Sequence, residues 1–293
     1  MSDPSANTLT ILGCGTLGTA ILCGIQDALS SSSDASSIPA SIPSRFIACV
    51  QRASSGARIE AVLAVGASCA PTQILVNDNL AGIRASSAVL LGCKPYMVGA
   101  ILSAPGVAEA LSGKLLVSIC AGVTIGQLHE LAPKARGVVR VMPNTAAKVR
   151  ESMTVIAPQM GLPEEDLEMV QWVFSQIGRC LVLEEKHMDV ATALCGSGPA
   201  FYALFVEAMA DGGVLMGVPR QAAVEMAAQT MRGTAAMILE GQHPAIIREQ
   251  VSTPGGCTIA GLTRMEDGNV RSVIARAIEE ATNVAGGLGG KKK

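Results

Sequence analysis

The sequence predicts an α/β protein: a doubly wound sheet followed by an all-helical region. Three observations lead to this fold class. A Gly-x-Gly-x-x-Gly turn at Gly13, Gly15 and Gly18 joins an apolar strand to an apolar helix. Runs of Val, Ile and Leu then alternate with helical stretches, which is typical of strands covered on both faces. Beyond about residue 185 the strand signals stop and apolar residues recur at helical spacing.

The glycine turn follows a strand at residues 9–12 and opens a helix at Leu17–Leu29. In a dinucleotide-binding turn the first glycine permits the bend, the second lets the backbone approach a pyrophosphate, and the third packs the helix on the strand. The free N–H groups and the positive end of the helix dipole would then hold the pyrophosphate. The order of these features predicts a Rossmann-type domain, although a purely structural strand–turn–helix would also carry such glycines.

Composition restricts the possible partners. The chain has 293 residues, a net charge of −2, 49% hydrophobic residues and a mean hydropathy of +0.41. The charge offers no footprint for nucleic acid or an acidic membrane. No uninterrupted apolar run approaches the roughly 18–20 residues of a membrane span. We therefore expect the apolar surplus to be buried in a core and between subunits of a homo-oligomer.

The cysteines and histidines point away from metals. Nine cysteines are scattered without a Cys-x-x-Cys pair, and His129, His187 and His243 form no cluster. This pattern predicts neither a disulfide framework nor a metal site, and it favours a reducing compartment. The N-terminal residues resemble neither a signal nor a transit peptide, so we expect a cytoplasmic protein.

The expected strands follow one another through the first half of the chain. A Ser- and Pro-rich stretch, Ser30–Ser44, is expected to be a loop insertion before the second strand. A helix is expected to start near Pro163, between the last two strands. The expected strands after the first are residues 45–50, 74–76, 87–93, 114–120, 137–142, 153–157 and 179–183.

Ligands of such sheets bind beyond the carboxyl ends of the strands. Besides the glycine turn, those ends carry Arg52, Lys94, Ala121 and Asn144. The second strand ends without the Asp or Glu that would bind a ribose 2′-OH. Arg52, with the nearby Ser54, Ser55 and Arg58, would instead pair with a 2′-phosphate, which favours NADP(H) over NAD(H). A solvated arginine at a strand end is the alternative.

Amphipathic helices are expected near residues 201–209, 223–238 and 271–284, with Pro219 at the first position of the second. This region is too apolar to stand alone, and pairing of two copies about a two-fold axis would bury its faces. We therefore expect a dinucleotide-binding domain at residues 1–185 and a helical dimerisation domain at 186–293.

One stretch of the helical region is not explained by packing. Residues 251–260 read Val-Ser-Thr-Pro-Gly-Gly-Cys-Thr-Ile-Ala. Pro254-Gly255-Gly256 exposes backbone amides just before a helix expected to open at Thr258, an arrangement suited to a small carboxylate. An ordinary turn with a threonine cap is the alternative.

Several motifs together resemble one family. They are Val251–Leu262, Lys94-Pro95, residues 141–145, residues 196–200 and residues 211–214, and with the glycine turn the resemblance extends from Ile11 to about Glu280. The sequence resembles the Δ1-pyrroline-5-carboxylate reductases. The resemblance implies NAD(P)H-dependent reduction of L-Δ1-pyrroline-5-carboxylate, a cyclic imino acid, to L-proline, the last step of proline biosynthesis. It also implies a homodimer, or a higher oligomer, formed through the C-terminal helices.

Carried over by position, the resemblance implies a set of site residues. The dinucleotide would be held by Gly13, Gly15, Thr16, Leu17, Gly18, Arg52, Asn79, Cys93, Lys94 and Ala121. The substrate would be held by Thr253, Gly256, Cys257, Thr258 and Asn144. In this assignment the N–H groups of Gly256 and Cys257 and the Thr253 side chain bind the carboxylate, and the Thr258 hydroxyl bonds the ring nitrogen.

Some roles stay open. Lys94 would support the cofactor, steer the anionic substrate or brace the turn at Pro95, and Asn144 would contact substrate or cap local backbone. Cys257 would be a reactive or an inert thiol. The alternatives for the whole chain are another imine or β-hydroxyacid reductase, and a non-catalytic NADP-binding regulator. The absence of a Lys or Asp from Cys195–Gly198 disfavours the former, and the Pro254–Thr258 turn disfavours the latter.

Overall fold

The computed structural model describes residues 7–31, 41–65 and 70–289. The chain forms two compact units that divide between Gly196 and Ser197, with the residues from Ala281 onward returning to the first. We call them the sheet unit and the helical unit. The boundary expected from sequence at residue 185 falls just after the last strand, whereas the compact units divide a few helical turns later.

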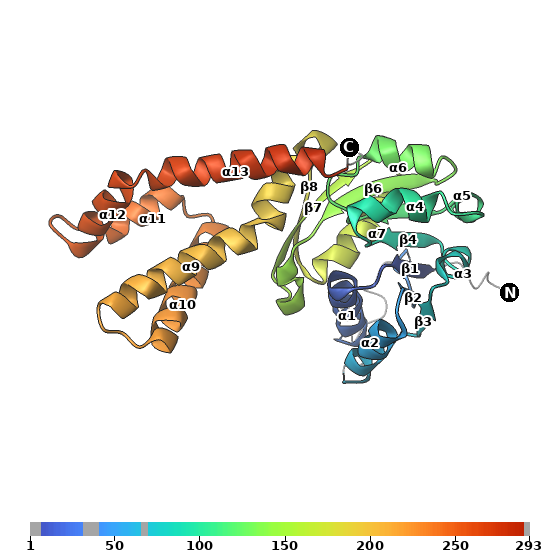
Figure 1. Cartoon of the computed structure of the whole chain (residues 1–293), viewed down its shortest axis with the longest axis horizontal. Coiled ribbons are helices and arrows are strands. Elements are labelled where there is room, and N and C mark those ends of the chain that lie inside the picture. Colours follow the sequence, from blue (N-terminus) through green and yellow to red (C-terminus); the bar gives the residue numbers. More distant parts are fainter. Residues whose placement is uncertain (1–6, 32–40, 66–69, 290–293) are drawn as a thin grey trace. The chain divides into compact units, whose positions relative to one another are not determined.

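The sheet unit contains an eight-stranded sheet in the order β3-β2-β1-β4-β5-β6-β7-β8 (Figure 1). All neighbouring pairs are parallel except β6 and β7. The strands are β1 Thr8–Leu12, β2 Arg45–Val50, β3 Thr72–Val76, β4 Ala88–Leu91, β5 Leu115–Ser118, β6 Gly137–Met142, β7 Ser152–Pro158 and β8 Gly178–Val182.

Helices connect these strands. The α-helices are α1 Thr16–Ser31, α2 Ala53–Val65, α3 Asn79–Arg84, α4 Val98–Leu102, α5 Val107–Ala110, α6 Ile125–Leu131, α7 Glu164–Ser175 and α8 Met188–Ala191. Shorter turns are η2 Pro95–Met97, η3 Thr145–Val149, η4 Glu185–His187 and the π-helical η5 Thr192–Gly196. Alternation of strands and helices confirms the predicted fold class.

Two apolar cores lie on opposite faces of the sheet. On β4, Leu90 packs in the core that includes residues of α1 and α7, while Val89 and Leu91 pack in the core that includes residues of α3 to α6. Successive side chains of a strand point to opposite faces, so a strand that is apolar at every position needs cover on both sides. This explains why continuous apolar runs marked the central strands.

The antiparallel direction of β7 has a simple cause. Only residues 143–151 connect β6 to β7, and η3 occupies part of them. A parallel crossover needs a dozen or more residues, so the chain has to return antiparallel. The next connection contains α7, which allows β8 to run parallel to β7.

Several element ends differ from the sequence expectation. β4 and β5 are shorter than expected, so Cys93 and Cys120 lie in loops just beyond their strands. Ser30 and Ser31 belong to α1, and residues 32–40 of the expected insertion lie outside the described residues. Asp78 caps α3 through its side chain.

The helical unit is built from α9 Gly198–Leu215, α10 Arg220–Leu239, α11 Pro244–Val251, α12 Cys257–Asp267 and most of α13 Val270–Gly287. Pro219 caps α10 instead of occupying its first position, and α12 begins at Cys257 instead of Thr258. Both differences are one residue.

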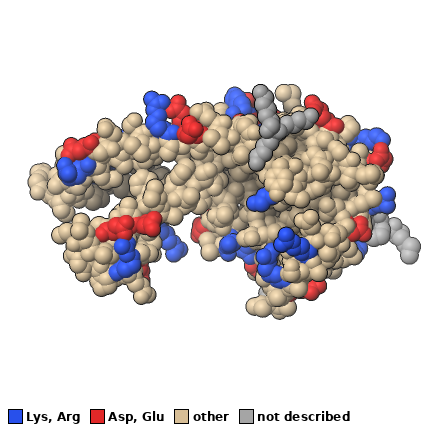
Figure 2. Space-filling model, in the orientation of Figure 1, with Lys and Arg blue, Asp and Glu red and all other residues tan. Residues whose placement is uncertain are grey.

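The helical unit leaves large apolar side chains in solvent. Leu204 is 64% exposed, Leu215 84% and Met216 82%. Figure 2 accordingly shows wide uncharged areas between small groups of charged side chains. By length and composition alone the stretch Glu185–Leu215 would suffice to cross a membrane, with only 17% of its most apolar window buried. This apolar surface needs a cover that the isolated chain does not supply.

Candidate active site

A cavity of about 950 Å³ lies at the carboxyl ends of the central parallel strands in the sheet unit. It brings together every residue expected to hold a dinucleotide except Arg52. Those lining it are Gly13, Gly15, Thr16, Leu17, Gly18, Asn79, Cys93, Lys94 and Ala121. The glycine turn forms one wall, and the loops after β3, β4 and β5 contribute the others.

The glycine turn needs its first and third glycines for steric reasons. Gly13 has φ +74°, and a Cβ there would lie 3.0 Å from the backbone N of Cys93. A Cβ at Gly18 would lie 3.1 Å from Cγ2 of Ile11 on β1. The N–H groups of Gly13 and Cys14 donate to the C=O of Cys49 at 3.1 and 3.0 Å, which fixes the turn to the end of β2.

The start of α1 presents free donors to the cavity. The N–H groups in the first turn of a helix have no intrahelical acceptor, and here they belong to Thr16, Leu17 and Gly18. The Thr19 hydroxyl and N–H both donate to the C=O of Gly15, at 2.7 and 2.9 Å, which ties that carbonyl into the helix. These N–H groups and the helix dipole form an anion-binding surface.

The end of β2 differs from the sequence expectation. Ser55 and Gln51 line the cavity, whereas Arg52 is exposed at the start of α2 and is not among the described residues that line it. Basic side chains gather over the α1–α2 region in Figure 2. Placing Arg52 at the ligand therefore requires its long side chain to reorient toward the cavity.

Sequence reasoning missed two residues at the end of β3. Asn77 and Asp78 line the cavity beside Asn79. Oδ1 of Asp78 accepts from the N–H of Ala81 at 3.0 Å, so this carboxylate caps α3 as it faces the cavity rim. The signal was present, because residues 77–79 follow a predicted strand and the carboxyl ends of all parallel strands meet at one edge.

Lys94 stands at the exit of β4, just before η2. Its backbone C=O accepts from the N–H of Met97 at 2.9 Å, while its side chain makes no capping hydrogen bond and is exposed at the cavity. The main chain of Lys94 thus braces the turn, and the ammonium group remains available to a ligand.

The loop after β5 is held by the end of the chain. Gly122 has φ +75°, and a Cβ there would lie 2.6 Å from the backbone N of Gly289. Nε2 of Gln127 donates to the C=O of Gly289 at 3.4 Å. Residues just after α13 therefore pack against the loop that brings Ala121 to the cavity.

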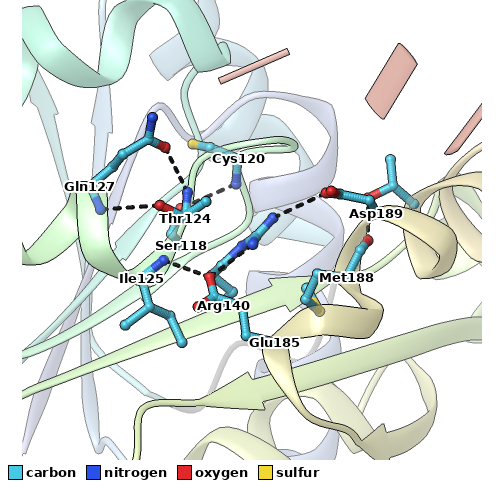
Figure 3. A network of polar contacts seen from close by, with 10 residues as sticks. Ser118, Cys120, Thr124, Ile125, Gln127, Arg140, Glu185, Met188 and Asp189 are labelled. Carbon is cyan, nitrogen blue, oxygen red and sulfur yellow. Dashed lines mark hydrogen bonds and ion pairs between the residues drawn. The ribbon is translucent and has the colours of Figure 1, made fainter. Parts of the chain in front are cut away.

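A buried arginine joins this loop to the residues after β8 (Figure 3). Arg140 on β6 is 4% exposed and pairs in register with Ser118 on β5. Its Nη1 donates to Oε1 of Glu185 at 2.9 Å, and its Nη2 lies 3.8 Å from Oδ1 of Asp189. The same Glu185 oxygen accepts from the N–H of Ile125 at 2.7 Å, at the start of α6. Sequence reasoning gave no sign of this network.

Asn144 caps local backbone. Its Oδ1 accepts from the N–H of Ala146 at 2.9 Å, and its N–H donates to the Ser152 hydroxyl at 3.0 Å. Its carbonyl oxygen is thus used at the start of η3, and only the amide NH₂ stays available for a substrate.

The predicted substrate turn lies in the helical unit. Gly255 has φ +68°, and the N–H of Gly256 donates to the C=O of Thr253 at 3.0 Å, as in a turn with Pro and Gly at its centre. A Cβ at Gly256 would lie 2.4 Å from Oγ1 of Thr253. The Gly256 N–H is therefore engaged within the turn, which corrects its expected role as a carboxylate donor.

The free donors of this turn begin one residue later. Gly256 caps α12 without a side-chain hydrogen bond, so the first-turn N–H groups belong to Cys257, Thr258 and Ile259. The N–H of Ile259 was not among the donors predicted from sequence. The Cys257 side chain is exposed, and the Thr258 side chain is half-buried.

The histidines take no part in these arrangements. Nδ1 of His243 accepts from the N–H of Ala245 at 3.2 Å and so caps α11. Among the described residues, no group of three or more His, Cys, Asp or Glu side chains is placed to hold a metal ion.

Comparison with known proteins identifies the family. The chain is 48% identical over 287 residues to a pyrroline-5-carboxylate reductase of Schizosaccharomyces pombe, covering 95% of this chain and 98% of that one. It is 48% identical over 316 residues to the Neurospora crassa protein of the same name, covering 99% and 95%. The chain belongs to the pyrroline-5-carboxylate reductase family.

Two further comparisons place the family features. The pyrroline-5-carboxylate reductase dimerisation family matches residues 185–288, which include the apolar stretch described above. A solved structure of the Plasmodium falciparum pyrroline carboxylate reductase with NADP bound matches with a TM-score of 0.79 and 26% identity, covering 97% of this chain and 99% of that one. The fold and the dimerisation region predicted from sequence are thereby confirmed.

Proposed function

We propose that this protein reduces L-Δ1-pyrroline-5-carboxylate to L-proline, the last step of proline biosynthesis. The observation that carries the proposal is the near-full-length identity of 48% to proteins named pyrroline-5-carboxylate reductase. The cavity at the glycine turn and the Thr253–Thr258 turn supply the two kinds of binding surface that this reaction requires.

The cavity fits a dinucleotide. Gly13 leaves no room for a Cβ beside Cys93, while a Cβ at Gly15 would meet nothing closer than 3.9 Å, which leaves space for a phosphate beside the backbone. The N–H groups of Thr16, Leu17 and Gly18 would bind the pyrophosphate, and Asn79, Cys93 and Ala121 would contact the rest of the molecule. Bound NAD(P)H supplies a hydride from nicotinamide C4 to the imine C5.

The turn before α12 suits a small imino acid. We assign the N–H groups of Cys257, Thr258 and Ile259 and the Thr253 hydroxyl to the substrate carboxylate, and the amide of Asn144 to an outer contact. The Thr258 hydroxyl oxygen would accept a hydrogen bond from the iminium N–H, and the hydroxyl would then donate one to the nitrogen of the developing amine. Gly256 serves this site by letting Thr253 approach the helix start.

The Lys94 ammonium is assigned to the cofactor side of the reaction. It is exposed at the cavity, and no acidic side chain in the described part of the chain forms an ion pair with it. A cation there stabilises a bound anion and steers an anionic substrate toward the cavity. Lys94 does not need to transfer a proton, because a protonated cyclic imine is already an electrophile.

The first test is turnover. The oxidation of NADPH and of NADH is followed by absorbance with L-Δ1-pyrroline-5-carboxylate as substrate, and the product is identified as proline. Turnover is the expected result. If the dinucleotide binds but the pyrroline is not reduced, the rival assignment to another imine reductase takes its place.

Thr258→Ala tests the chemical role. Loss of one preorganised donor costs about 2–4 kcal/mol of transition-state stabilisation, so kcat/KM is expected to fall by about 30- to 1,000-fold. Thr263→Ala on the same helix is the matched control, because its hydroxyl donates to the C=O of Ile259 and stays within the helix. Nearly full kcat/KM in Thr258→Ala would remove Thr258 from the reaction.

We propose a preference for NADPH. Ser55 and Gln51 at the cavity, with Arg52 and Arg58 nearby, favour a 2′-phosphate. The Asp78 carboxylate, which could otherwise bind a ribose 2′-OH, is engaged in capping α3. Arg52→Ala is expected to raise KM for NADPH while leaving KM for NADH unchanged. Equal changes for both cofactors would show that Arg52 does not recognise the phosphate.

We also propose that residues 1–185 bind cofactor and residues 186–293 bind substrate and dimerise, with a second copy covering the apolar helices. Nucleic acid and membranes are not expected partners. The eight free cysteines of the described chain fit a reducing compartment such as the cytoplasm. Cell fractionation, which separates cytosol from mitochondria, tests the location.

A further inference from the structure

Two thiols face each other at the ends of neighbouring strands. Leu91 on β4 pairs in register with Ser118 on β5, and Cys93 and Cys120 each lie two residues further along. Their Sγ atoms are 3.9 Å apart. Neighbouring strands run about 4.8 Å apart, close to the Cα separations that a disulfide spans. A rotation of the side chains would therefore bring the two sulfurs to bonding distance.

The pair lies on the wall of the dinucleotide cavity. Both cysteines line it, with Cys120 4% exposed and Cys93 half-buried. The Cys120 thiol lies 3.2 Å from the C=O of Cys93 and 3.4 Å from that of Leu91, within donor distance of both. We propose that Cys93 and Cys120 are a redox modification site: a dithiol that peroxide converts to a disulfide, which weakens dinucleotide binding.

The two thiols differ in acidity: Cys93 is the more acidic, as the thiol that attacks peroxide must be. A hydrogen bond from Cys120 lowers the pKa of Cys93 against the opposing effect of burial. The same interaction, together with burial, raises the pKa of Cys120. The thiolate is the nucleophile, so Cys93 attacks first and Cys120 resolves.

The reaction balances with hydrogen peroxide as oxidant. The Cys93 thiolate attacks one peroxide oxygen, the O–O bond breaks, and the products are a sulfenic acid and hydroxide. The Cys120 sulfur then attacks the Cys93 sulfur and the S–O bond breaks. The hydroxyl of the sulfenic acid leaves as water, with the proton of the Cys120 thiol. Two electrons pass from the thiols to the peroxide, and dithiothreitol returns them by thiol exchange.

The disulfide changes the cavity through the glycine turn. The backbone N and Cα of Cys93 lie 3.0 and 3.1 Å from where a Cβ of Gly13 would be, so the two segments are in close contact. Bonding also removes the Cys120 S–H donor from the carbonyls of Leu91 and Cys93. A shift of the Cys93 loop is therefore transmitted to Gly13. The ligand affected rests on the proposed function, but the disulfide itself does not.

The test treats the full-length protein with hydrogen peroxide and measures two quantities. Trypsin digestion without reductant should yield residues 85–114 cross-linked to residues 115–134, because Lys94 precedes proline and is not cleaved. NADPH binding, followed by nicotinamide fluorescence, should weaken by about tenfold or more in Kd, equivalent to about 1.4 kcal/mol. Dithiothreitol should reverse both changes, and NADPH added first should slow them.

Variants separate this pair from the other cysteines. Cys120→Ser should abolish the cross-link and leave Cys93 as a sulfenic acid that dimedone labels. Cys49→Ser, at another cavity-lining cysteine, should keep the cross-link and the loss of binding, each relative to its own untreated sample. A protein that binds NADPH but forms no 93–120 cross-link overturns the proposal, as does one whose NADPH affinity is unchanged by the cross-link. If the untreated protein binds no dinucleotide, the proposed function fails while the cross-link still tests the pair.

Discussion

The two units of the chain bury their apolar residues very differently. In the sheet unit Phe46, Leu90 and Phe174 are at most 1% exposed in the core on one face of the sheet, and Val89 and Leu91 are fully buried in the core on the other face. In the described part of the helical unit the buried apolar residues are Ala210, Ala223, Ala227 and Ile247. The sheet unit has a core of its own, whereas the helical unit depends on another surface to cover its helices.

This contrast separates two functions. The cavity proposed to bind the dinucleotide is built from the sheet unit, and the predicted substrate turn lies in the helical unit. If a second copy supplies the missing cover, assembly should control substrate turnover while cofactor binding depends on the sheet unit alone.

The largest expected effect comes from charging the exposed face of α9. Tyr202, Met209 and Met216 recur at seven-residue intervals and are 61%, 54% and 82% exposed. Side chains at this spacing lie on one face of a helix. Tyr202→Glu with Met209→Glu puts four carboxylates into a two-fold interface, and each desolvated charge costs several kcal/mol. We expect a monomer by light scattering, no pyrroline reduction, and retained NADPH binding.

A charged substitution in the sheet unit is the control for the α9 double variant. Met160→Glu makes a similar change at a fully exposed methionine of the sheet unit and should leave assembly unchanged. An unaltered dimer in the double variant would mean that this face of α9 is not covered by a second copy.

The next effect sharpens the contrast between buried and exposed ion pairs. Arg140→Met removes a 4%-exposed guanidinium, after which the N–H of Ile125 is the one hydrogen-bond partner of Glu185 among residues 7–31, 41–65 and 70–289. Breaking a fully buried pair costs about 3–5 kcal/mol, and because the Glu185 side chain is 35% exposed we expect about 2–3 kcal/mol. Urea denaturation measures the loss.

An exposed pair in the helical unit provides the control. Nη1 of Arg264 lies 3.0 Å from Oδ2 of Asp267, and the two side chains are 85% and 57% exposed. Arg264→Met should change the free energy of unfolding by less than about 1 kcal/mol, as is typical of surface pairs. Equal decreases in the free energy of unfolding of the two variants would show that the Arg140 network stabilises the fold no more than a surface ion pair does.

The sequence predicts the elements of the sheet unit best. β2 and β6 were predicted to the residue, because strands buried on both faces are apolar at nearly every position, with Arg45 and Arg140 as the exceptions. The glycine turn was recognisable because Gly13 has a positive φ beside the backbone of Cys93, and because Gly18 leaves little space for a side chain beside Ile11. The direction of β7 was not stated, since it depends on a connection length that matters only once both partner strands are placed.

The site was predictable in residue type more than in detail. The cavity contains nearly all the residues expected to hold the dinucleotide, but Arg52 lies outside its lining and Asp78 within it. The Gly256 N–H was assigned to substrate, yet the turn that makes this glycine necessary also uses its donor. Local hydrogen bonds of this kind leave no periodic signal. The Arg140 network was invisible because its members are dozens of residues apart in sequence.

A pair of glycines on either side of the start of α12 gives a smaller effect. Gly256→Ala places a Cβ 2.4 Å from Oγ1 of Thr253, whereas Gly261→Ala on the same helix meets nothing within 4 Å. Moving the Thr253 side chain should raise KM for the pyrroline by about 5- to 30-fold, equivalent to about 1–2 kcal/mol. Gly261→Ala should leave KM unchanged and stabilise the helix by about 0.5–1 kcal/mol.

Steady-state kinetics and NADPH affinity, measured together, decide the outcome. An unchanged NADPH Kd in both variants is required if cofactor and substrate are handled by separate units. A raised NADPH Kd in Gly256→Ala would show that the turn serves the dinucleotide, and an unchanged pyrroline KM would remove it from substrate binding.

The smallest effect compares a buried thiol with an exposed one through pH. Burial raises the pKa of Cys49 from 9.0 to about 12, while Cys257 is exposed at the start of α12. Above pH 9 the unfolded chain loses the Cys49 proton and the folded chain keeps it, so stability is intact below pH 9 and falls as pH rises toward 12. The slope is at most about 1.4 kcal/mol per pH unit, and a step from about pH 8 to 9.5 should cost less than about 1 kcal/mol.

Urea denaturation at the two pH values measures this loss. The free energy of unfolding should decrease less in Cys49→Ala than in the parent, and by the same amount as the parent in Cys257→Ala. An identical decrease in the parent and in Cys49→Ala would mean that alkaline loss of stability arises elsewhere in the sheet unit.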